Sequence, residues 1–223
     1  MGSLIYLVNT RPDLCFAVNQ LSQAMVQLTK LFWKAAKHVL RYLRGTTHYG
    51  LWYRRIEGVK LQGFTNANWA GSPLDRKSTS GGIFNFGSAA VSWYSRKHRS
   101  VALSTTEAKY MAASQAACEA IWMWKILVGL FGQMMDPTVI YCDNQSCIKL
   151  SENPVFHDRS KHIDIRYHHL RDCVVKRIMM LLYISTKEHD AYILTKALSK
   201  GKFEFHRDRI GVADNPFLVE REC

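Results

Sequence analysis

The chain has 223 residues, of which 48% are hydrophobic and 22% charged, and this composition suits one globular domain with a real core plus an appendage. Lysine and arginine number 30 against 18 aspartates and glutamates, and the net charge of +12 makes nucleic acid the first candidate partner, with an inert basic surface as the alternative. The six cysteines include no C-x-x-C pair and indicate no disulfide framework. The N-terminus has no basic segment, which excludes a signal peptide, and the apolar runs are too short to span a bilayer. We therefore expect an intracellular protein, cytoplasmic or nuclear and not secreted.

The first predicted element is helical, because apolar residues such as Leu14, Val18 and Leu21 recur at helical spacing between residues 14 and 44. The glycines at the two ends of residues 45–50 interrupt that pattern. Glycines and polar turns then separate four short strand-like runs, at residues 51–54, 60–65, 82–86 and 90–95. This spacing predicts an antiparallel meander.

The second half of the chain alternates helices and strands. Residues 104–131 are helical throughout, and we expect two helices there. The elements predicted after them are a strand at 138–142, a short helix at 144–151, a helix at 161–176, a strand at 179–185 and a last helix at 187–199. Three strands followed by alternating helices and strands indicate an α/β fold with a mixed sheet.

Three polar segments adjoin the ends of these elements. GFTNANWAG at 63–71 ends the first long strand, LSTTEAKY at 103–110 starts a helix, and VIYCDNQ at 139–145 ends a central strand. Strand carboxyl ends and helix starts face one crevice in α/β sheets. Carboxylates gathered there bind hard divalent cations, and two such ions about 4 Å apart stabilise the attacking and leaving oxygens of a phosphodiester.

Several motifs, taken together and in order, resemble the ribonuclease H region of copia-type LTR retrotransposons. They are RKSTSG at 76–81, VSW at 91–93, ALSTTEA at 102–108, YCDNQS at 141–146, NPVFH at 153–157, SKHIDIRY at 160–167 and ILTK at 193–196. Upstream, GSLIY at 2–6, NTRPD at 9–13 and RYLRG at 41–45 resemble the end of that family's reverse transcriptase. The likeness extends to about residue 212.

The resemblance implies a ribonuclease H-like fold, with a mixed five-stranded sheet flanked by helices. It divides the chain into a helical reverse transcriptase remnant at 1–55, a ribonuclease H-like domain at 56–212 and a tail at 213–223. The implied activity is hydrolysis of the RNA strand of RNA–DNA hybrids by two-metal catalysis with Mg²⁺, or alternatively Mn²⁺. The implied partners are an RNA–DNA hybrid or other nucleic acid and the rest of a Pol polyprotein, and no membrane. The chain lacks the Tyr-x-Asp-Asp motif of the polymerase, so we expect no polymerase activity.

The family places four carboxylates around its metals, and two of them have counterparts here. Glu107 matches the glutamate on the first long helix, and its alternative role is a capping box with Ser104. Asp143 matches the aspartate that ends the central strand, and its alternative role is to cap the helix that follows. The resemblance makes both residues catalytic metal ligands.

The other two carboxylates are missing. Asn66 stands where the family has its first metal-bridging aspartate, and Tyr192 stands where it has its last. Asp190 lies two residues from Tyr192, about 200° round a helix, so we do not expect it to substitute. Because Mg²⁺ relies on anionic oxygen, we expect a weakly bound ion if any, and impaired or absent catalysis.

Nucleic-acid binding can persist without catalysis. We expect phosphate contacts from a turn near the site and from a basic stretch further on, the alternative being solvated surface. The residues are Arg76, Lys77, Ser78, Arg159, Lys161, His162 and Arg166. The two function classes left open are a ribonuclease H, active or residual, and a non-catalytic nucleic-acid-binding fragment.

Three weaker candidates complete the survey. Trp69 and Trp93 are either hybrid contacts or, as is usual for tryptophan beside a strand, core residues. His157, His162, His168, His169 and Cys173 lack the pair-plus-pair spacing of a zinc site. His189 precedes the last predicted helix, where a surface histidine is the default and a role in product release the alternative.

Overall fold

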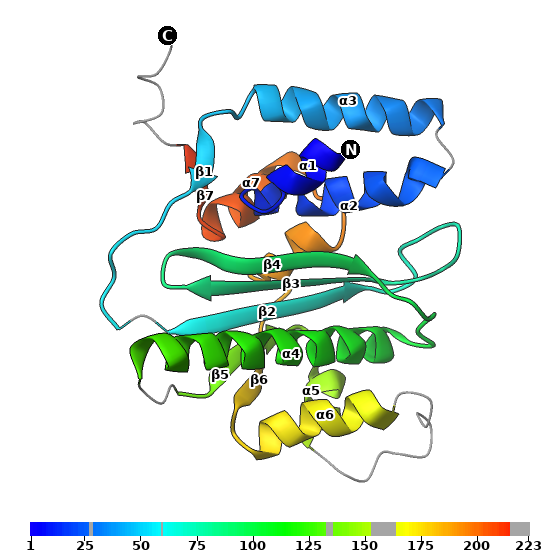
Figure 1. The fold of residues 1–223 in the computed structure, drawn as a ribbon. Coiled ribbons are helices and arrows are strands. Elements are labelled where there is room, and N and C mark those ends of the chain that lie inside the picture. Colours follow the sequence, from blue (N-terminus) through cyan, green and yellow to red (C-terminus); the bar gives the residue numbers. More distant parts are fainter. Residues whose placement is uncertain (27–28, 59, 133–135, 153–163, 215–223) are drawn as a thin grey trace.

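The computed structural model describes residues 1–26, 29–58, 60–132, 136–152 and 164–214, and its elements form three layers (Figure 1). The middle layer is a five-stranded sheet in the order β4-β3-β2-β5-β6. Helices α4, α5 and α6 lie on one face of this sheet, while the N-terminal helices and the C-terminal elements lie on the other (Figure 1).

The sheet is mixed because a meander meets two parallel strands. β2 (Leu61–Asn68), β3 (Thr79–Phe86) and β4 (Ala89–Lys97) pair antiparallel in sequence order, as the glycine-separated runs predict. β5 (Thr138–Cys142) joins the other side of β2 in parallel, and β6 (Met179–Tyr183) pairs parallel with β5. β2 and β5 therefore run side by side toward the same edge of the sheet.

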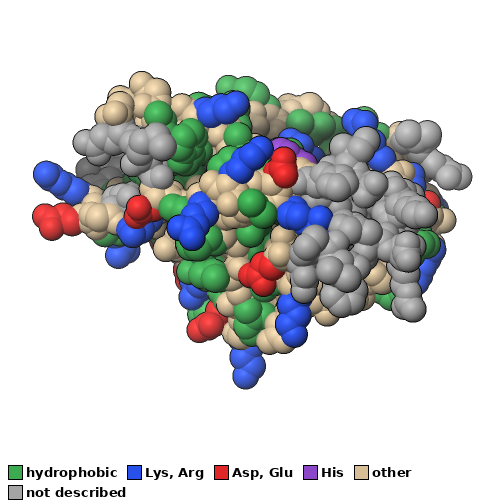
Figure 2. All heavy atoms as spheres, turned by 90° about the horizontal axis from the view of Figure 1, so that it is seen from below, with side chains coloured by type: hydrophobic (Ala, Val, Ile, Leu, Met, Phe, Trp, Pro, Cys, Tyr) green, Lys and Arg blue, Asp and Glu red, His purple; other side chains and the backbone are tan. Residues whose placement is uncertain are grey.

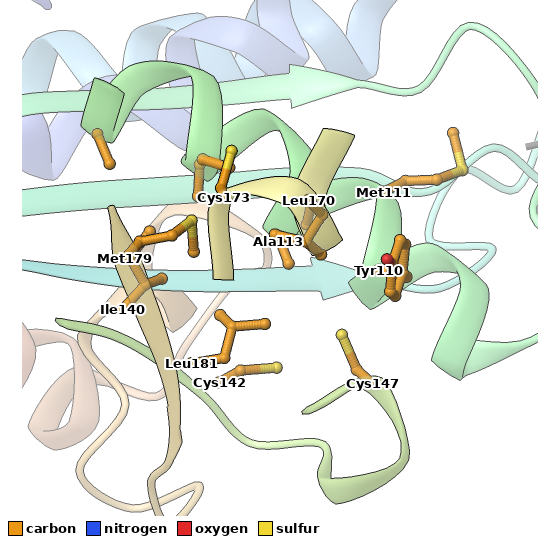
Figure 3. Packing of buried hydrophobic residues seen from close by; sticks show 14 of the residues in the cluster. Tyr110, Met111, Ala113, Ile140, Cys142, Cys147, Leu170, Cys173, Met179 and Leu181 are labelled. Atoms are coloured by element: carbon orange, nitrogen blue, oxygen red, sulfur yellow. The ribbon is translucent and has the colours of Figure 1, made fainter. Parts of the chain in front are cut away.

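One face of the sheet is covered by α4 (Thr105–Phe131), which packs with the shorter helices α5 (Gln145–Glu152) and α6 (Asp164–Val175). Alanines line its buried side, and the fully buried Tyr110 belongs to the same cluster as Ala113, Ile140 and Leu170 (Figure 3). The expectation of two helices between 104 and 131 is wrong. The segment is rich in strong helix formers and has no proline, so one helix continues until Gly132 adopts a left-handed conformation.

The opposite face carries the C-terminal elements. The helix expected at 187–199 is wrong, since the chain forms the short 3-10 helix η5 (Asp190–Leu194) and then α7 (Lys200–Arg209). All five residues of η5 are buried, so this segment has no polar face on which a longer amphipathic helix depends. β7 (Val212–Asp214) spans the position at which the tail was expected to begin, residue 213, and it pairs with β1 (Tyr49–Leu51). Residues 215–223 lie outside the described part.

The N-terminal segment is helical but broken into several pieces. They are α1 (Gly2–Leu7), η1 (Pro12–Leu14), α2 (Cys15–Gln23), η2 (Ala24–Val26) and α3 (Lys30–Arg44). Helix α2 packs on β4, and α3 packs on α2 as the outermost element (Figure 1). Cys15 lies in one buried cluster with Ile83 and Ile210, so this segment shares its core with the sheet.

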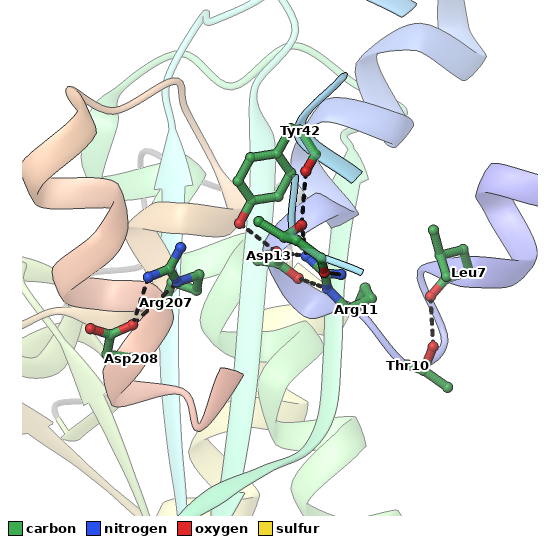
Figure 4. A network of polar contacts seen from close by, with 8 residues as sticks. Leu7, Thr10, Arg11, Asp13, Tyr42, Arg207 and Asp208 are labelled. Atoms are coloured by element: carbon green, nitrogen blue, oxygen red, sulfur yellow. Dashed lines mark hydrogen bonds and ion pairs between the residues drawn. The ribbon is translucent and has the colours of Figure 1, made fainter. Parts of the chain in front are cut away.

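A buried polar network also holds the N-terminal segment in place (Figure 4). Arg11 forms a two-pronged ion pair with Asp13 and donates to the carbonyl and the hydroxyl of Thr46. The Tyr42 hydroxyl donates to Asp13 at 2.8 Å. Trp93 of β4 donates its indole N–H to the carbonyl of Val8, so this tryptophan is a packing residue at the same junction.

Among the described residues, none of the helices combines the length and the apolar character needed to cross a bilayer.

Candidate active site

The sheet brings three of the four positions singled out by the resemblance to neighbouring elements. Asn66 lies near the end of β2, and Asp143 directly follows β5, the parallel neighbour of β2. Tyr192 comes from η5, which packs against β2 and β3. Glu107 lies in the first turn of α4.

Both carboxylate oxygens of Asp143 already have partners. Lys109 of α4 forms an ion pair with Oδ1, and the Tyr192 hydroxyl donates to Oδ2 at 2.7 Å. Only 3% of the Asp143 side chain and 15% of the Lys109 side chain are exposed to solvent, so the pair is largely buried. Asp143 does not cap the next helix, because Asn144 accepts the hydrogen bond from the Cys147 amide instead.

Burial alone would raise the pKa of Asp143. The hydrogen bonds from Lys109 and Tyr192, together with the charge of Lys109, outweigh that effect and hold the pKa below its ordinary value. The pKa of Tyr192 is raised to about 12 by burial and by its bond to Asp143. At neutral pH Asp143 is therefore a carboxylate and Tyr192 a protonated phenol.

Glu107 forms hydrogen bonds at the start of its own helix, α4. Ser104 accepts a hydrogen bond from the Glu107 amide at 3.1 Å, and Glu107 Oε2 accepts one from the Leu103 amide at 2.8 Å. This reciprocal pair resembles a capping box, except that Glu107 accepts from the amide of Leu103 and not from that of Ser104. The cap that the sequence offered as an alternative role is therefore present in the structure.

Asn66 is buried and has one oxygen without a hydrogen bond. Its Nδ2 donates to Thr195 Oγ1 at 2.9 Å, and Thr195 in turn donates to the carbonyl of Tyr192. Its Oδ1 is buried and has no hydrogen-bond partner among the described residues. This oxygen suits a cation, although an amide brings no charge.

Two further basic side chains adjoin Tyr192. The ammonium group of Lys196 lies 3.9 Å from the centroid of the Tyr192 ring, and burial lowers its pKa. His189 is fully buried, so the expectation of a surface histidine is wrong. Its Nε2 donates to the Thr65 carbonyl at 3.0 Å, and burial lowers its pKa to about 4.

Asp190 does not take the place of the missing carboxylate. It accepts hydrogen bonds from His206 Nδ1 and Arg209 Nε, both at 2.9 Å, and these two residues belong to α7. Its side chain is 2% exposed. The carboxylate is therefore committed to holding α7 against η5.

The donor set does not suit two divalent ions. Asp143 is shared between Lys109 and Tyr192, Glu107 bonds the start of α4, and Asn66 is neutral. Among the described residues, no three histidine, cysteine, aspartate or glutamate side chains are grouped to hold a metal ion, zinc included. His157 and His162 lie outside the described residues, as does the His168 side chain, whereas His169 lies 3.4 Å from Cys118.

Three of the residues expected to contact phosphate lie together in the turn between β2 and β3. Arg76 is exposed at the turn, and Lys77 lies 3.9 Å from Asp75. Ser78 is buried and accepts a hydrogen bond from the Ala70 amide, so its hydroxyl stabilises the turn. Arg159, Lys161 and His162 lie outside the described residues, as does the side chain of Arg166.

Trp69 is half exposed beside this turn. Its indole N–H donates to the Ala102 carbonyl at 2.9 Å, which ties the end of β2 to the segment before α4. Lys109 was not among the residues expected to act at this site. No signal in the sequence indicated this role, because Lys109 lies two positions after Glu107 and residues two apart on a helix project about 200° from each other.

Comparison with known proteins identifies relatives over almost the whole chain, although no family model matches it. The chain is 43% identical over 216 residues to the retrovirus-related Pol polyprotein from transposon TNT 1-94 of Nicotiana tabacum, a match that covers 96% of this chain and 16% of the relative. It is 41% identical over 216 residues to the Pol polyprotein from transposon RE2 of Arabidopsis thaliana, covering 97% of this chain and 15% of the relative. The chain thus spans about a sixth of the length of these relatives.

Comparison with solved structures gives a partial match. The LC11-RNase H1 structure in complex with an RNA/DNA hybrid aligns with 61% of this chain and 94% of its own, at 10% identity and a TM-score of 0.45. The expected α/β fold, with a mixed five-stranded sheet flanked by helices, is confirmed by the strand order and the strand pairing. The chain belongs to the retrovirus-related Pol polyproteins of copia-type transposons.

Proposed function

We propose that this chain is a ribonuclease H domain, descended from an enzyme that cleaves the RNA strand of RNA–DNA hybrids, in which cleavage is lost or strongly reduced. The observation that carries the proposal is the double engagement of Asp143 by Lys109 and Tyr192. An ammonium group and a phenol thus hold the carboxylate that the family uses as a metal ligand.

Charge balance supports this proposal. Two divalent ions bring four positive charges, which four carboxylates would neutralise. Here Asp143 and Glu107 supply two negative charges, and Lys109 and Lys196 lie beside Asp143 and Tyr192. Mg²⁺ or Mn²⁺ would have to displace the Lys109 ammonium from a largely buried pair, so we expect at most weak binding of one ion.

The substrate class we propose to be retained is an RNA–DNA hybrid or another nucleic acid. Arg76 and Lys77 lie in the turn after β2 and carry charge suited to phosphate. Binding without cleavage is the second candidate function, and the net charge of +12 favours it. We also propose that residues 1–55 derive from the reverse transcriptase and that the rest of a Pol polyprotein is a partner.

The test is repair of the site. A labelled RNA–DNA hybrid is incubated in Mg²⁺ and in Mn²⁺ with the native chain, with Asn66→Asp/Tyr192→Asp, and with the triple variant that adds Lys109→Ala. We expect no cleavage by the native chain and metal-dependent cleavage by the triple variant. Adding Asp143→Asn to the triple variant is the matched control, and it must abolish the gained activity. Brisk cleavage by the native chain would overturn the proposal.

A further inference from the structure

Helix α3 concentrates positive charge on one side. Its sequence, KLFWKAAKHVLRYLR, contains no acidic residue. At about 100° per residue, five of its cations fall within an arc of about 80°. They are Lys30, Lys34, Lys37, Arg41 and Arg44, and all five are exposed. We refer to these five residues as the α3 basic stripe.

The packing of α3 fixes the direction in which the stripe faces. Val39 is buried against α2 in a cluster that also contacts Phe32 and Leu43. On another side of the helix, the Tyr42 hydroxyl is bonded to Asp13, and the Tyr42 ring meets the edge of Phe203. Because both contacts are buried or half-buried, α3 cannot rotate, and the five residues of the stripe stay exposed to solvent.

The charges of the stripe are not neutralised within the part of the chain that the structure describes. None of its five residues forms an ion pair there. Lys34, Lys37, Arg41 and Arg44 line a groove together with Leu40, and the Lys37 ammonium lies 5.1 Å from the Trp33 ring centroid. On the α4 and α6 side, by contrast, basic side chains are scattered among acidic and apolar ones (Figure 2).

We propose that the α3 basic stripe binds the phosphate backbone of a nucleic-acid duplex. From Lys30 to Arg44 the helix rises about 21 Å, which corresponds to roughly six base pairs of a duplex. A rigid, straight row of cations matches the regular phosphate row of a duplex. The inference rests on the nucleic-acid binding of the proposed function and assigns it a site. This surface lies on the outermost layer and needs neither a metal nor an intact cleavage site.

Two other ligands fit the helix less well. Single strands are held largely by aromatic side chains on which successive bases stack, whereas Trp33 is the one strongly exposed aromatic residue of α3. A helix that lies on a membrane inserts a continuous apolar face, but Val39, Phe32 and Leu43 pack against the protein. Leu31, Trp33 and Leu40 remain exposed, and the last two lie beside the cations of the stripe. The unpaired cations therefore favour a duplex.

The experiment measures binding of a fluorescein-labelled 20-base-pair DNA duplex by anisotropy, in EDTA, at several salt concentrations. The test variant is Lys34→Glu/Lys37→Glu. The matched control is Lys125→Glu/Lys149→Glu, which makes the same charge change at exposed lysines of α4 and α5. Lys34→Gln/Lys37→Gln is a milder second variant, and thermal melting monitored by circular dichroism checks that each variant folds.

We expect the test variant to lose at least about tenfold in affinity and its slope of log affinity against log salt to fall by about two, since each phosphate contact contributes about 0.9. The control should keep most of the native affinity. An unchanged slope in the test variant, or an equal loss in the control, would overturn the proposal. Tighter binding to a 20-nucleotide single strand or to vesicles containing phosphatidylserine would overturn it as well. Because EDTA prevents metal-dependent cleavage, the result is independent of the repair experiment.

Discussion

The Tyr192 hydroxyl donates a 2.7 Å hydrogen bond to Asp143 Oδ2 across 49 residues of sequence. This bond joins η5 to the end of β5, at the edge of the sheet where Asn66 also lies. The resemblance of the motifs to ribonuclease H predicts a carboxylate at each of these two positions, and a metal ion would hold two such carboxylates together. Here a neutral phenol bonds directly to the remaining carboxylate, so the two elements are joined without an ion.

The first prediction concerns this bond. Tyr192→Phe removes the donor and leaves Asp143 with Lys109 alone, so we expect the free energy of unfolding to fall by about 1.5–3 kcal/mol, as for other hydrogen bonds to charged groups. Urea denaturation measures the change. Tyr183→Phe is the matched control, because Tyr183 is 53% exposed at the end of β6. An equal effect of the two substitutions would contradict the hydrogen bond between Tyr192 and Asp143.

The second prediction concerns Lys109. Lys109→Ala leaves a largely buried carboxylate without its counter-charge, which costs about 3–5 kcal/mol in fully buried pairs. Because Tyr192 still donates to Asp143, we expect a smaller loss of about 2–3 kcal/mol in urea denaturation. Lys125→Ala, an exposed position of the same helix, should change stability by less than about 0.5 kcal/mol. A Lys109 variant as stable as this control would show that the ion pair does not form.

The third prediction tests whether the N-terminal segment belongs to the folded unit. The side chains of Arg11 and Asp13 are only 5% and 0% exposed, and Arg11 also bonds Thr46. We expect Arg11→Ala to destabilise the whole chain by about 3–5 kcal/mol in a single unfolding transition. The exposed Arg55→Ala is the control. Loss of the N-terminal helices alone, with the sheet domain unfolding as before, would contradict the shared core.

The fourth prediction concerns pH. The pKa of buried His189 is lowered to about 4, below its ordinary value of 6.5, so the unfolded chain binds more protons than the folded one between these values. Stability should therefore fall as the pH decreases from about 6.5 to about 4, by roughly 3 kcal/mol from this residue. In His189→Gln the dependence over this window should be flatter. Equal slopes for the native chain and the variant would contradict a buried neutral histidine.

Much of the fold could be predicted from the sequence. The meander follows from apolar runs separated by glycines, and the strand before Asp143 from the apolar run 138–142. The division of 14–44 into α2 and α3, and the short η5, could not be predicted, because burial against other elements decided them. In η5, burial on all sides removed the periodicity that a sequence pattern detects.

The candidate site could be predicted from the sequence only in part. Asn66 and Tyr192 were identifiable as departures from the family pattern, and Ser104 with Glu107 as a cap. The role of Lys109 was not, since residues two apart on a helix project about 200° from each other. Only the packing of α4 beside β5 shows that this side chain reaches Asp143.

The most direct test of the central claim is a calorimetric titration of Mn²⁺ into the native chain and into Asn66→Asp/Lys109→Ala/Tyr192→Asp. If Lys109 and Tyr192 occupy Asp143 as the structure shows, the native chain will give no saturable binding at millimolar Mn²⁺, while the triple variant will give it. Tight, saturable binding of two Mn²⁺ ions by the native chain would contradict the account.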